Sequence, residues 1–185
     1  MIIDIFLFSP LKMVLIVTLW SISMIKSISI RPIQQSDNVE LAKVIRNSLE
    51  EYGENKPGTV YTDPTTDDLY SLFQIPKGFY FVAEVKDEAI GGCGIFPTKG
   101  LPQGYGELVK LYLDKNYRGL GLGKLLMEKC FAASRKLNYT HLYLESIPAL
   151  NQAVHLYEKM GFEKIDHRIG ESGHFAWDLW MVKEL

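Results

Sequence analysis

The stretch YRGLGLGKLL, residues 117–126, places one arginine and three glycines directly before an apolar pattern. The apolar residues recur every three or four positions and predict a helix that begins inside the glycine stretch: Leu122, Leu126, Cys130, Ala133 and Leu137. The first N–H groups of a helix have no partner within it and point back toward the preceding loop. Because glycines at alternate positions also remove Cβ atoms, the stretch has the features of an anion site, and a phosphate is the first candidate ligand.

Two common phosphate motifs do not fit these residues. A Walker A loop needs Gly, four residues, and then Gly-Lys-Ser/Thr; Gly123-Lys124 matches the end, but position 118 is Arg and position 125 is Leu. A dinucleotide fingerprint needs G-x-G-x-x-G, whereas the spacing here is G-x-G-x-G. The sequence therefore argues against a nucleotide triphosphatase and against a dinucleotide-binding domain.

The composition is that of one soluble globular domain: 185 residues, 47% hydrophobic and 23% charged, with a net charge of −2. Without an excess of basic residues, neither nucleic acid nor an acidic membrane surface is an expected partner. Cys93 and Cys130 have neither metal-ligand spacing nor the number of a disulfide framework, so we interpret them as reduced core thiols. His141, His167 and His174 do not cluster in the sequence, and we predict no metal.

Residues 1–23 form an apolar extension that is interrupted by Asp4, Pro10 and Lys12. Three interpretations are open: a start codon assigned upstream of Met24, a secretory signal, or a membrane anchor. The interruptions argue against a spanning helix, and the chain from Met24 opens at once into an alternating strand pattern. We therefore favour a cytoplasmic domain over residues 24–185, with membrane contact expected only if residues 1–23 are retained.

The rest of the pattern predicts a mixed α/β domain. Strands are expected at 28–30, 79–85, 89–97, 104–113, 141–147, 162–169 and 174–182. Helices are expected from Asp37, as the N-cap, to Gly53, over a short stretch from 63 or 66 to 73, and over 121–137 and 150–160. The helix over 121–137 joins two strands that we expect to be parallel.

Several segments together resemble the GNAT superfamily of N-acetyltransferases. The run Arg118-Gly119-Leu120-Gly121-Leu122-Gly123 resembles its R/Q-x-x-G-x-G/A pyrophosphate loop, ELVKLYLDKNYRG resembles its fourth strand, and AVHLYEKMGF resembles its C-terminal helix and turn. The resemblance covers roughly residues 24–185. It implies a mixed central sheet of six to seven strands with about four helices, in which parallel strands 4 and 5 splay apart.

The resemblance also implies the co-substrate, acetyl-CoA. Its pyrophosphate would lie over the backbone N–H groups of residues 118–124, and its pantetheine arm would lie along residues 111–113 as an added strand would. The family often has a cofactor-binding asparagine where this chain has Leu150. The asparagine of this chain, Asn151, lies one residue later and therefore departs from the family pattern. The implied binding residues are Leu111, Tyr112, Leu113, Arg118, Gly119, Leu120, Gly121, Leu122, Gly123, Lys124 and Asn151.

The same resemblance implies two catalytic residues. Glu107 resembles the strand carboxylate that acts as a base on the amine, and Tyr157 resembles the tyrosine that protonates the leaving thiolate. Other roles stay open at this point: Glu107 could only position the acceptor, Glu145 on the facing strand is a second candidate base, and Tyr157 has the helical spacing of a core residue. Retention of both residues favours an enzyme.

The expected activity is transfer of an acetyl group from acetyl-CoA to a primary amine of a small molecule or peptide, by direct attack in a ternary complex. The alternatives are a non-catalytic acetyl-CoA-binding regulatory module and a transferase of another acyl group. A monomer or homodimer is expected. We expect acceptor specificity in residues 53–70, 98–106 and 168–177, with Tyr61, Tyr105 and His174 as leading candidates. The acidic residues near the first loop hint at a cationic acceptor: Glu50, Glu51, Glu54, Asp67 and Asp68.

Overall fold

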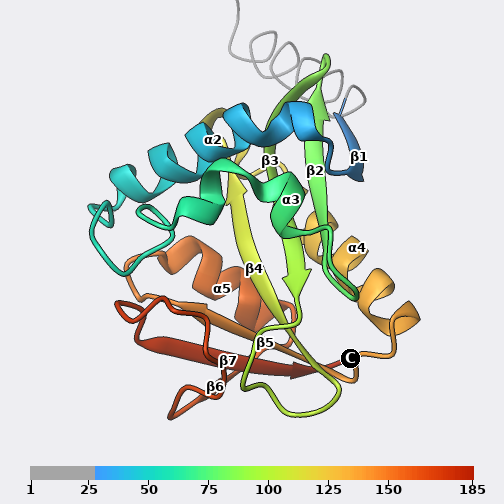
Figure 1. Cartoon of the computed structure of the whole chain (residues 1–185). Helices are drawn as coiled ribbons and strands as arrows, with labels where there is room; N and C mark the ends of the chain where they lie inside the picture. The colour runs from blue at the N-terminus through green and yellow to red at the C-terminus, as the bar shows by residue number, and fades with distance from the viewer. Residues whose placement is uncertain (1–27) are drawn as a thin grey trace, which may run out of the picture.

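The computed structural model describes residues 28–185, so the interpretations of residues 1–23 lie outside the described residues. A seven-stranded sheet has the order β1-β2-β3-β4-β5-β7-β6 (Figure 1), which confirms the expected mixed α/β fold. The strands are β1 (Ile28–Pro32), β2 (Phe79–Val85), β3 (Glu88–Phe96), β4 (Tyr105–Leu113), β5 (His141–Ser146), β6 (Glu163–Ile165) and β7 (Leu179–Glu184). The α-helices are α2 (Asn38–Glu51), α3 (Leu69–Leu72), α4 (Leu122–Lys136) and α5 (Asn151–Lys159).

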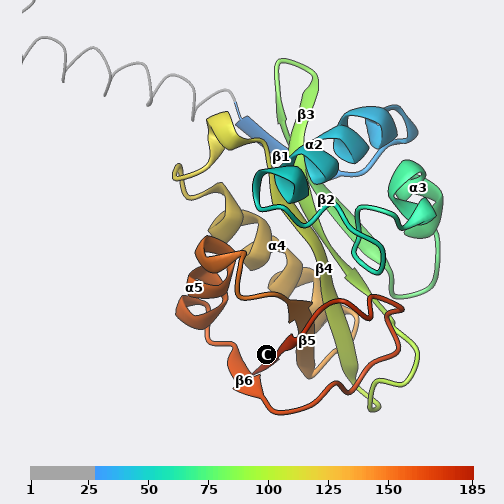
Figure 2. The same cartoon turned by 90° about the vertical axis from the view of Figure 1, so that its left-hand side faces the viewer.

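Helices cover both faces of the sheet, with α2 and α3 on one face and α4 and α5 on the other (Figure 2). Each pair encloses its own apolar core. On the first face, Leu41 and Ile45 of α2 pack with Tyr80 and Val82 of the sheet. On the second face, Leu126 and its neighbours on α4 pack against the opposite side of β2, β3 and β4, as the helical spacing predicts. No helix within residues 28–185 is both long and apolar enough to cross a bilayer.

The start of α2 differs from the expected cap. Asp37 occupies the N-cap position, but its carboxylate makes no capping bond to α2. It instead accepts hydrogen bonds from the Gln34 N–H at 2.7 Å and from both terminal nitrogens of Arg31 at 2.8 Å. A short 3₁₀ turn (Gln35–Asp37) precedes the helix, and Asp37 closes that turn instead. The carboxylate therefore anchors β1 to the start of the helix layer.

Two glycines on β3 let the side chain of Tyr80, on β2, reach β4. A Cβ at Gly92 would lie 2.3 Å from the ring of Tyr80, and one at Gly94 would lie 2.5 Å from it, so both positions must be glycine for this ring to cross β3. The Tyr80 hydroxyl then donates to the Lys110 carbonyl at 2.8 Å. Lys110 has a φ of 51°, and here two residues of β4 stand opposite the single residue Cys93 of β3. This arrangement is a β-bulge, which changes the face of the sheet toward which the following side chains of β4 point.

Strands β4 and β5 are parallel as predicted, but they pair over only three residues each, from Tyr105↔His141 to Glu107↔Tyr143. Beyond these pairs, β4 continues to Leu113 without β5, while β5 stays paired with β7. The two strands therefore separate in the middle of the sheet. The backbone groups of β4 that lose β5 as a partner are available to another extended chain or ligand.

The last two strands are shorter than the sequence predicts. Residues 166–178 join β6 to β7 as an irregular segment, which we call the strap (Figure 1). Arg168 holds the strap together, because its Nη2 donates to the carbonyls of His174 at 2.8 Å and Trp177 at 3.2 Å. The strap also rests on the loop after α2, where the Ala176 N–H donates to the Gly58 carbonyl at 3.2 Å.

Candidate active site

Three adjoining cavities follow the gap between β4 and β5. The glycine groove, about 460 Å³, lies beside the start of α4, and the strap cavity, about 520 Å³, lies between the strap and the loop after α2. The junction cavity, about 30 Å³, lies between them. It shares Leu111, Tyr112 and Leu150 with the groove and Val109, Lys110 and His174 with the strap cavity. The three cavities therefore adjoin one another, with the junction cavity in the middle.

The glycine groove contains most of the residues that the resemblance assigns to the cofactor. Nine of these eleven residues line it: Leu111, Tyr112, Leu113, Arg118, Gly119, Gly121, Leu122, Gly123 and Lys124. Leu120 packs against the core on the α4 face, and Asn151 is exposed and outside the lining. The sequence analysis missed the groove residues contributed by α2 and α5: Ser48, Tyr52, Gln152, Ala153, Leu156 and Lys159.

Glycine is required at these three positions for different structural reasons. Gly119 and Gly121 have φ values of 77° and 80°, and a Cβ on either would meet no other atom within 4 Å. Backbone conformation requires glycine there, while the space above them stays open. Gly123 is different, because its Cβ would lie 2.9 Å from Cδ2 of Leu156. This third glycine allows α4 to pack closely against α5.

The groove is suited to an anion. The first helical bond of α4 runs from the Leu125 N–H to the Gly121 carbonyl at 3.1 Å, so the N–H groups before it have no partner in the helix. Three cationic side chains line the groove, Arg118, Lys124 and Lys159, and none of its described lining residues is acidic. Amides, the helix dipole and these cations therefore all favour a negatively charged group.

Arg118 fixes the glycine loop to its surroundings. Its Nε donates to the Leu113 carbonyl at 2.8 Å, at the end of β4. Its Nη1 donates to Glu51 at 2.6 Å and its Nη2 donates to the Ser48 hydroxyl at 2.9 Å, both on α2. One side chain thus ties the loop to a strand on one side and to a helix on the other.

The junction cavity brings together the two predicted catalytic residues, Glu107 and Tyr157. Glu107 is 3% exposed and accepts a hydrogen bond from the Thr98 hydroxyl. Burial, together with the nearby Glu145 carboxylate, raises the pKa of Glu107 to about 8, although the Thr98 hydrogen bond opposes this shift. Burial likewise raises the pKa of Tyr157, which favours its protonated form. The cavity therefore holds a carboxyl group that titrates near neutral pH and a protonated phenol.

Three further residues that line the junction cavity each carry a buried polar atom with no hydrogen-bond partner among the described residues: Tyr112 Oη, Ser146 Oγ and Trp177 Nε1. All three side chains are more than nine-tenths buried. Buried groups of this kind are normally satisfied, so a bound polar atom is the expected partner. Trp177 lies at the end of the 168–177 segment expected to contact the acceptor, whereas the sequence analysis does not single out Ser146, because β5 and the strap meet here only in the folded chain.

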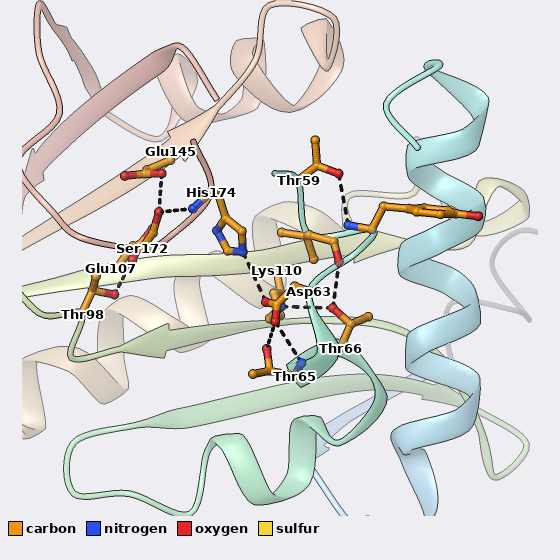
Figure 3. Close-up of polar contacts among 12 residues, drawn as sticks. Thr59, Asp63, Thr65, Thr66, Thr98, Glu107, Lys110, Glu145, Ser172 and His174 are labelled. Atoms are coloured by element: carbon orange, nitrogen blue, oxygen red, sulfur yellow. Dashed lines mark hydrogen bonds and ion pairs between the residues drawn. The ribbon is translucent and has the colours of Figure 1, made fainter. Parts of the chain in front are cut away.

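A charged cluster lies where the junction cavity meets the strap cavity, since Lys110 and His174 line both. Figure 3 draws its polar contacts. Lys110 Nζ lies 3.0 Å from Asp63 Oδ2 and 3.3 Å from Thr66 Oγ1, and His174 Nε2 lies 3.2 Å from the same Asp63 oxygen. Burial alone would raise the pKa of Asp63, but the His174 contact, the Lys110 charge and Thr65 hold it well below its usual range. Burial lowers the pKa of Lys110, while the Asp63 charge opposes that shift.

The second candidate base, Glu145, is engaged from three sides. Its carboxylate accepts hydrogen bonds from the Tyr143 hydroxyl at 2.8 Å and from the Ser172 hydroxyl at 2.6 Å, the latter drawn in Figure 3. Arg168 Nε lies 3.3 Å from the same carboxylate. Glu107 has a single hydrogen-bonding partner by comparison, so it is the less constrained of the two acids.

The predicted acceptor residues separate in space. His174 lines the strap cavity, whereas the Tyr61 hydroxyl donates to Glu50 at 2.7 Å and Tyr105 stacks on His141 at a ring distance of 4.4 Å. The five acidic residues near the first loop do not line the strap cavity. They pair elsewhere, as with Glu51 on Arg118 and Asp67 on Arg46, and give no support to a cationic acceptor.

Cys93 and Cys130 are buried and free, as the sequence analysis expects. The Cys130 thiol donates to the Cys93 carbonyl at 3.5 Å, inside the core on the α4 face. Within residues 28–185, no group of three or more His, Cys, Asp or Glu side chains is arranged to hold a metal ion.

Known proteins are similar to this chain in sequence. Residues 44–162 match the model of the Acetyltransferase (GNAT) family. The chain is similar to the uncharacterised N-acetyltransferase YjgM of Escherichia coli K12, with 36% identity over 156 residues that cover 84% of this chain and 93% of that protein.

Solved structures of low sequence identity share the fold. A GNAT-family acetyltransferase from Staphylococcus aureus Mu50 has a TM-score of 0.76 at 21% identity, covering 85% of this chain and 99% of that one. The PaiA N-acetyltransferase of Thermoplasma acidophilum, solved in complex with coenzyme A, has a TM-score of 0.65 at 19% identity, covering 86% of this chain and 99% of that one.

Proposed function

Because the chain belongs to the GNAT family of acetyltransferases, we propose that it transfers the acetyl group of acetyl-CoA to a primary amine of a small molecule or peptide, by direct attack in a ternary complex. The proposal includes the cytoplasm as the place of reaction and a monomer or homodimer as the active form. The observation that carries it is the arrangement of the cavities: a groove suited to an anion adjoins the small cavity lined by Glu107 and Tyr157, which adjoins a second cavity of comparable size to the groove.

The groove residues fit acetyl-CoA. The open space over Gly119 and Gly121 and the free amides at the start of α4 would hold the pyrophosphate, and the nearby cations Lys124 and Lys159 would favour its negative charge. The β4 backbone that has no pairing with β5 would hold the amides of the pantetheine arm. The similar PaiA enzyme, solved with coenzyme A, supports this assignment. Acetyl-CoA supplies an acetyl group activated as a thioester.

We assign the first proton transfer to Glu107. An alkylammonium group with a pKa near 10.4 must lose a proton before its nitrogen can attack, so a base is needed. Glu107 has a pKa of about 8, close to the operating pH, which suits a general base. Its Oε2 is held by Thr98, a lining residue of the strap cavity, so the carboxyl group lies at the boundary from which an amine would approach.

We assign the second proton transfer to Tyr157. Its hydroxyl stays protonated at neutral pH because burial raises its pKa, and it lines the same junction cavity as Glu107. It would give its proton to the sulfur of the CoA thiolate that leaves when the thioester C–S bond breaks, which releases CoA as the free thiol. The unpartnered donors on Tyr112, Ser146 and Trp177 would orient the acetyl carbonyl in the junction cavity.

The test is release of free CoA thiol by the full chain over a panel of amines, amino acids and peptides, with acetyl-CoA binding measured by calorimetry on the same preparation. Binding with amine-dependent thiol release is the expected result. Binding without release for every acceptor would favour the regulatory-module alternative, and faster turnover with a longer acyl-CoA would favour the other-acyl alternative. Absence of binding would overturn the assignment of the groove.

A further inference from the structure

The charged side chains that line the strap cavity occur as closed pairs. Lys110 pairs with Asp63 at 3.0 Å, inside the wall, and Lys99 pairs with Glu171 at 3.0 Å, at the rim. His174 adds a further contact to Asp63 at 3.2 Å. The inner wall of the described lining therefore presents neither a free carboxylate to a cation nor an unpaired lysine to an anion, and the exposed charges of Lys99 and Glu171 lie at the rim.

Most hydroxyl groups of the lining are also engaged within the protein. Thr98 donates to Glu107, and Ser172 donates to Glu145 at 2.6 Å. Thr65 donates to Asp63 at 2.7 Å, and Thr59 donates to backbone carbonyls, the nearer of them at 2.8 Å. Thr62 is exposed, and its hydroxyl makes no hydrogen bond to another of the described residues. Much of the hydrogen-bonding capacity of this wall is thus already used.

The remaining wall is apolar. It is formed by Leu72 of α3, by Phe96 and Val109 of the sheet, and by Phe175 of the strap. Phe175 is 74% exposed and lies on Gly58, where a Cβ would come within 2.5 Å of its ring. The absence of a side chain at Gly58 lets this aromatic ring close one side of the cavity.

Resting on the proposed acetyl transfer, we infer that the acceptor is a small primary amine whose body is uncharged and mainly apolar, such as an alkylamine or an arylalkylamine. The amine nitrogen would lie at the junction beside Glu107, and the body would lie against Phe96, Val109 and Phe175. This names a substrate class that the sequence left open, and it differs from the cationic acceptor hinted at by the acidic residues.

The physical reason is the cost of burying a charge without a partner. The second ammonium of a diamine would find Asp63 already engaged by Lys110 and His174. The carboxylate of an amino acid would approach Lys110 only beside the Asp63 carboxylate, which repels it. An amine without a second charge avoids both costs. The same apolar wall lowers the pKa of the reacting ammonium, which assists its deprotonation.

The experiment compares pairs of matched size: hexylamine with 1,6-diaminohexane, and 2-phenylethylamine with phenylalanine. The readout is kcat/KM for CoA thiol release at saturating acetyl-CoA, with the diamine value halved for its two amines. The uncharged-body amines should have kcat/KM values at least about tenfold higher, the ratio given by one unpaired charge costing about 1.4 kcal/mol. Equal or higher values for the diamine or the amino acid would overturn this inference and leave acetyl transfer standing.

A variant makes the test directional. Thr62→Asp adds an unpaired carboxylate to the cavity wall and should shift the ratio of kcat/KM values toward 1,6-diaminohexane by about tenfold. Thr62→Asn is the matched neutral control and should keep the wild-type ratio. An unchanged ratio in the aspartate variant would argue that the acceptor body does not lie in this cavity. If no amine is acetylated although acetyl-CoA binds, the proposed function itself fails, together with this inference.

Discussion

Glu107 and Lys110 lie three residues apart on β4, yet both line the junction cavity. In a regular strand, residues three apart point to opposite faces of the sheet. The bulge at Lys110, opposite Cys93, brings the two side chains to the same face. Tyr80 holds the bulge through the Lys110 carbonyl. The local backbone therefore sets a titrating carboxyl beside a fixed ion pair.

Glu107→Gln should lower kcat by about 10²–10⁴-fold, because the amide cannot accept the amine proton. The wild-type kcat/KM should rise with pH and level off above about 8, following the pKa of Glu107, and this step should be missing from the variant. Steady-state pH profiles measure both effects. Glu158→Gln, at an exposed site on α5, is the matched control and should keep the wild-type profile. A variant profile identical to the wild type would remove Glu107 from the mechanism.

Glu107 should also make the stability of the protein depend on pH, in the direction opposite to its effect on activity. The folded protein keeps the Glu107 proton up to a pH of about 8, whereas the unfolded chain loses it near 4.5. Wild-type stability should therefore fall as pH rises through this window, relative to the Gln variant. Denaturant unfolding at several pH values measures the difference in free energy of unfolding. A difference that does not change with pH would show that burial does not perturb this carboxyl group.

Tyr157→Phe should lower kcat by at least about 10²-fold while the Kd of acetyl-CoA stays unchanged, because only the proton donor is removed. Calorimetry and turnover on one preparation separate the two quantities. Tyr139→Phe removes a buried hydroxyl that donates to the Lys77 carbonyl at 3.2 Å, away from the three cavities, and serves as the control. Equal activity in the two variants would assign Tyr157 a packing role only.

Gly121→Ala should weaken acetyl-CoA binding and also destabilise the fold by about 1–2 kcal/mol, because alanine is strained at a φ of 80°. Gly53→Ala has the same kind of strain, at a φ of 68°, in open space at the end of α2 and outside the groove. Both variants should lose similar stability, but only the first should lose affinity. Similar affinities for the two would show that the loop does not contact the ligand.

Asp63→Asn should destabilise the protein at neutral pH by about 3–5 kcal/mol, because it leaves the buried Lys110 without its anionic partner. In the wild type, the pKa of Asp63 is held below its ordinary 3.8, so this stabilisation is present above that pH and is lost on acidification below it. Unfolding curves of the two proteins should therefore converge at low pH. Equal stability at neutral pH would contradict the ion pair.

Trp177→Phe removes a buried N–H that has no partner among the described residues, so the free energy of unfolding should change little. If this N–H orients the acetyl carbonyl, kcat should nevertheless fall by about tenfold or more. Trp180→Phe is the matched control, because Trp180 Nε1 is also unpartnered but does not line the junction cavity. Equal kcat values for both variants would exclude the orienting role.

Much of the fold could be predicted because its signals are local. The spacing of Leu122 and Leu126 specifies α4, the left-handed turns at Gly119 and Gly121 require glycine, and the hydrophobic alternation specifies the strands that form the centre of the sheet. Asp37 shows the limit of such signals. Its carboxylate could cap α2 or pair with Arg31, and only the position of β1 decides for the pair.

Some residues of the candidate site could be predicted from sequence motifs, and others are brought together only by folding. Glu107, Tyr157 and the groove glycines could be selected from short motifs, because their neighbours in the chain carry the pattern. Asp63, Thr98 and Trp177 were predicted only as members of the acceptor segments, and Ser146 was not predicted, because these residues lie on different segments and meet only after folding. Lys110, inside the apolar run of β4, was a sign of a buried charge, but the sequence could not name its partner Asp63, which is 47 residues away.

By itself, the sequence determined the order of strands and helices, the glycine loop and the two candidate catalytic residues, Glu107 and Tyr157, since motifs, periodicity and backbone conformation act over a few residues. The tertiary structure alone decided where β4 bulges, where it leaves β5, and that the charges around the strap cavity close into pairs. Those features depend on contacts between distant segments, and the electrostatic environment of a buried group is the sum of such contacts.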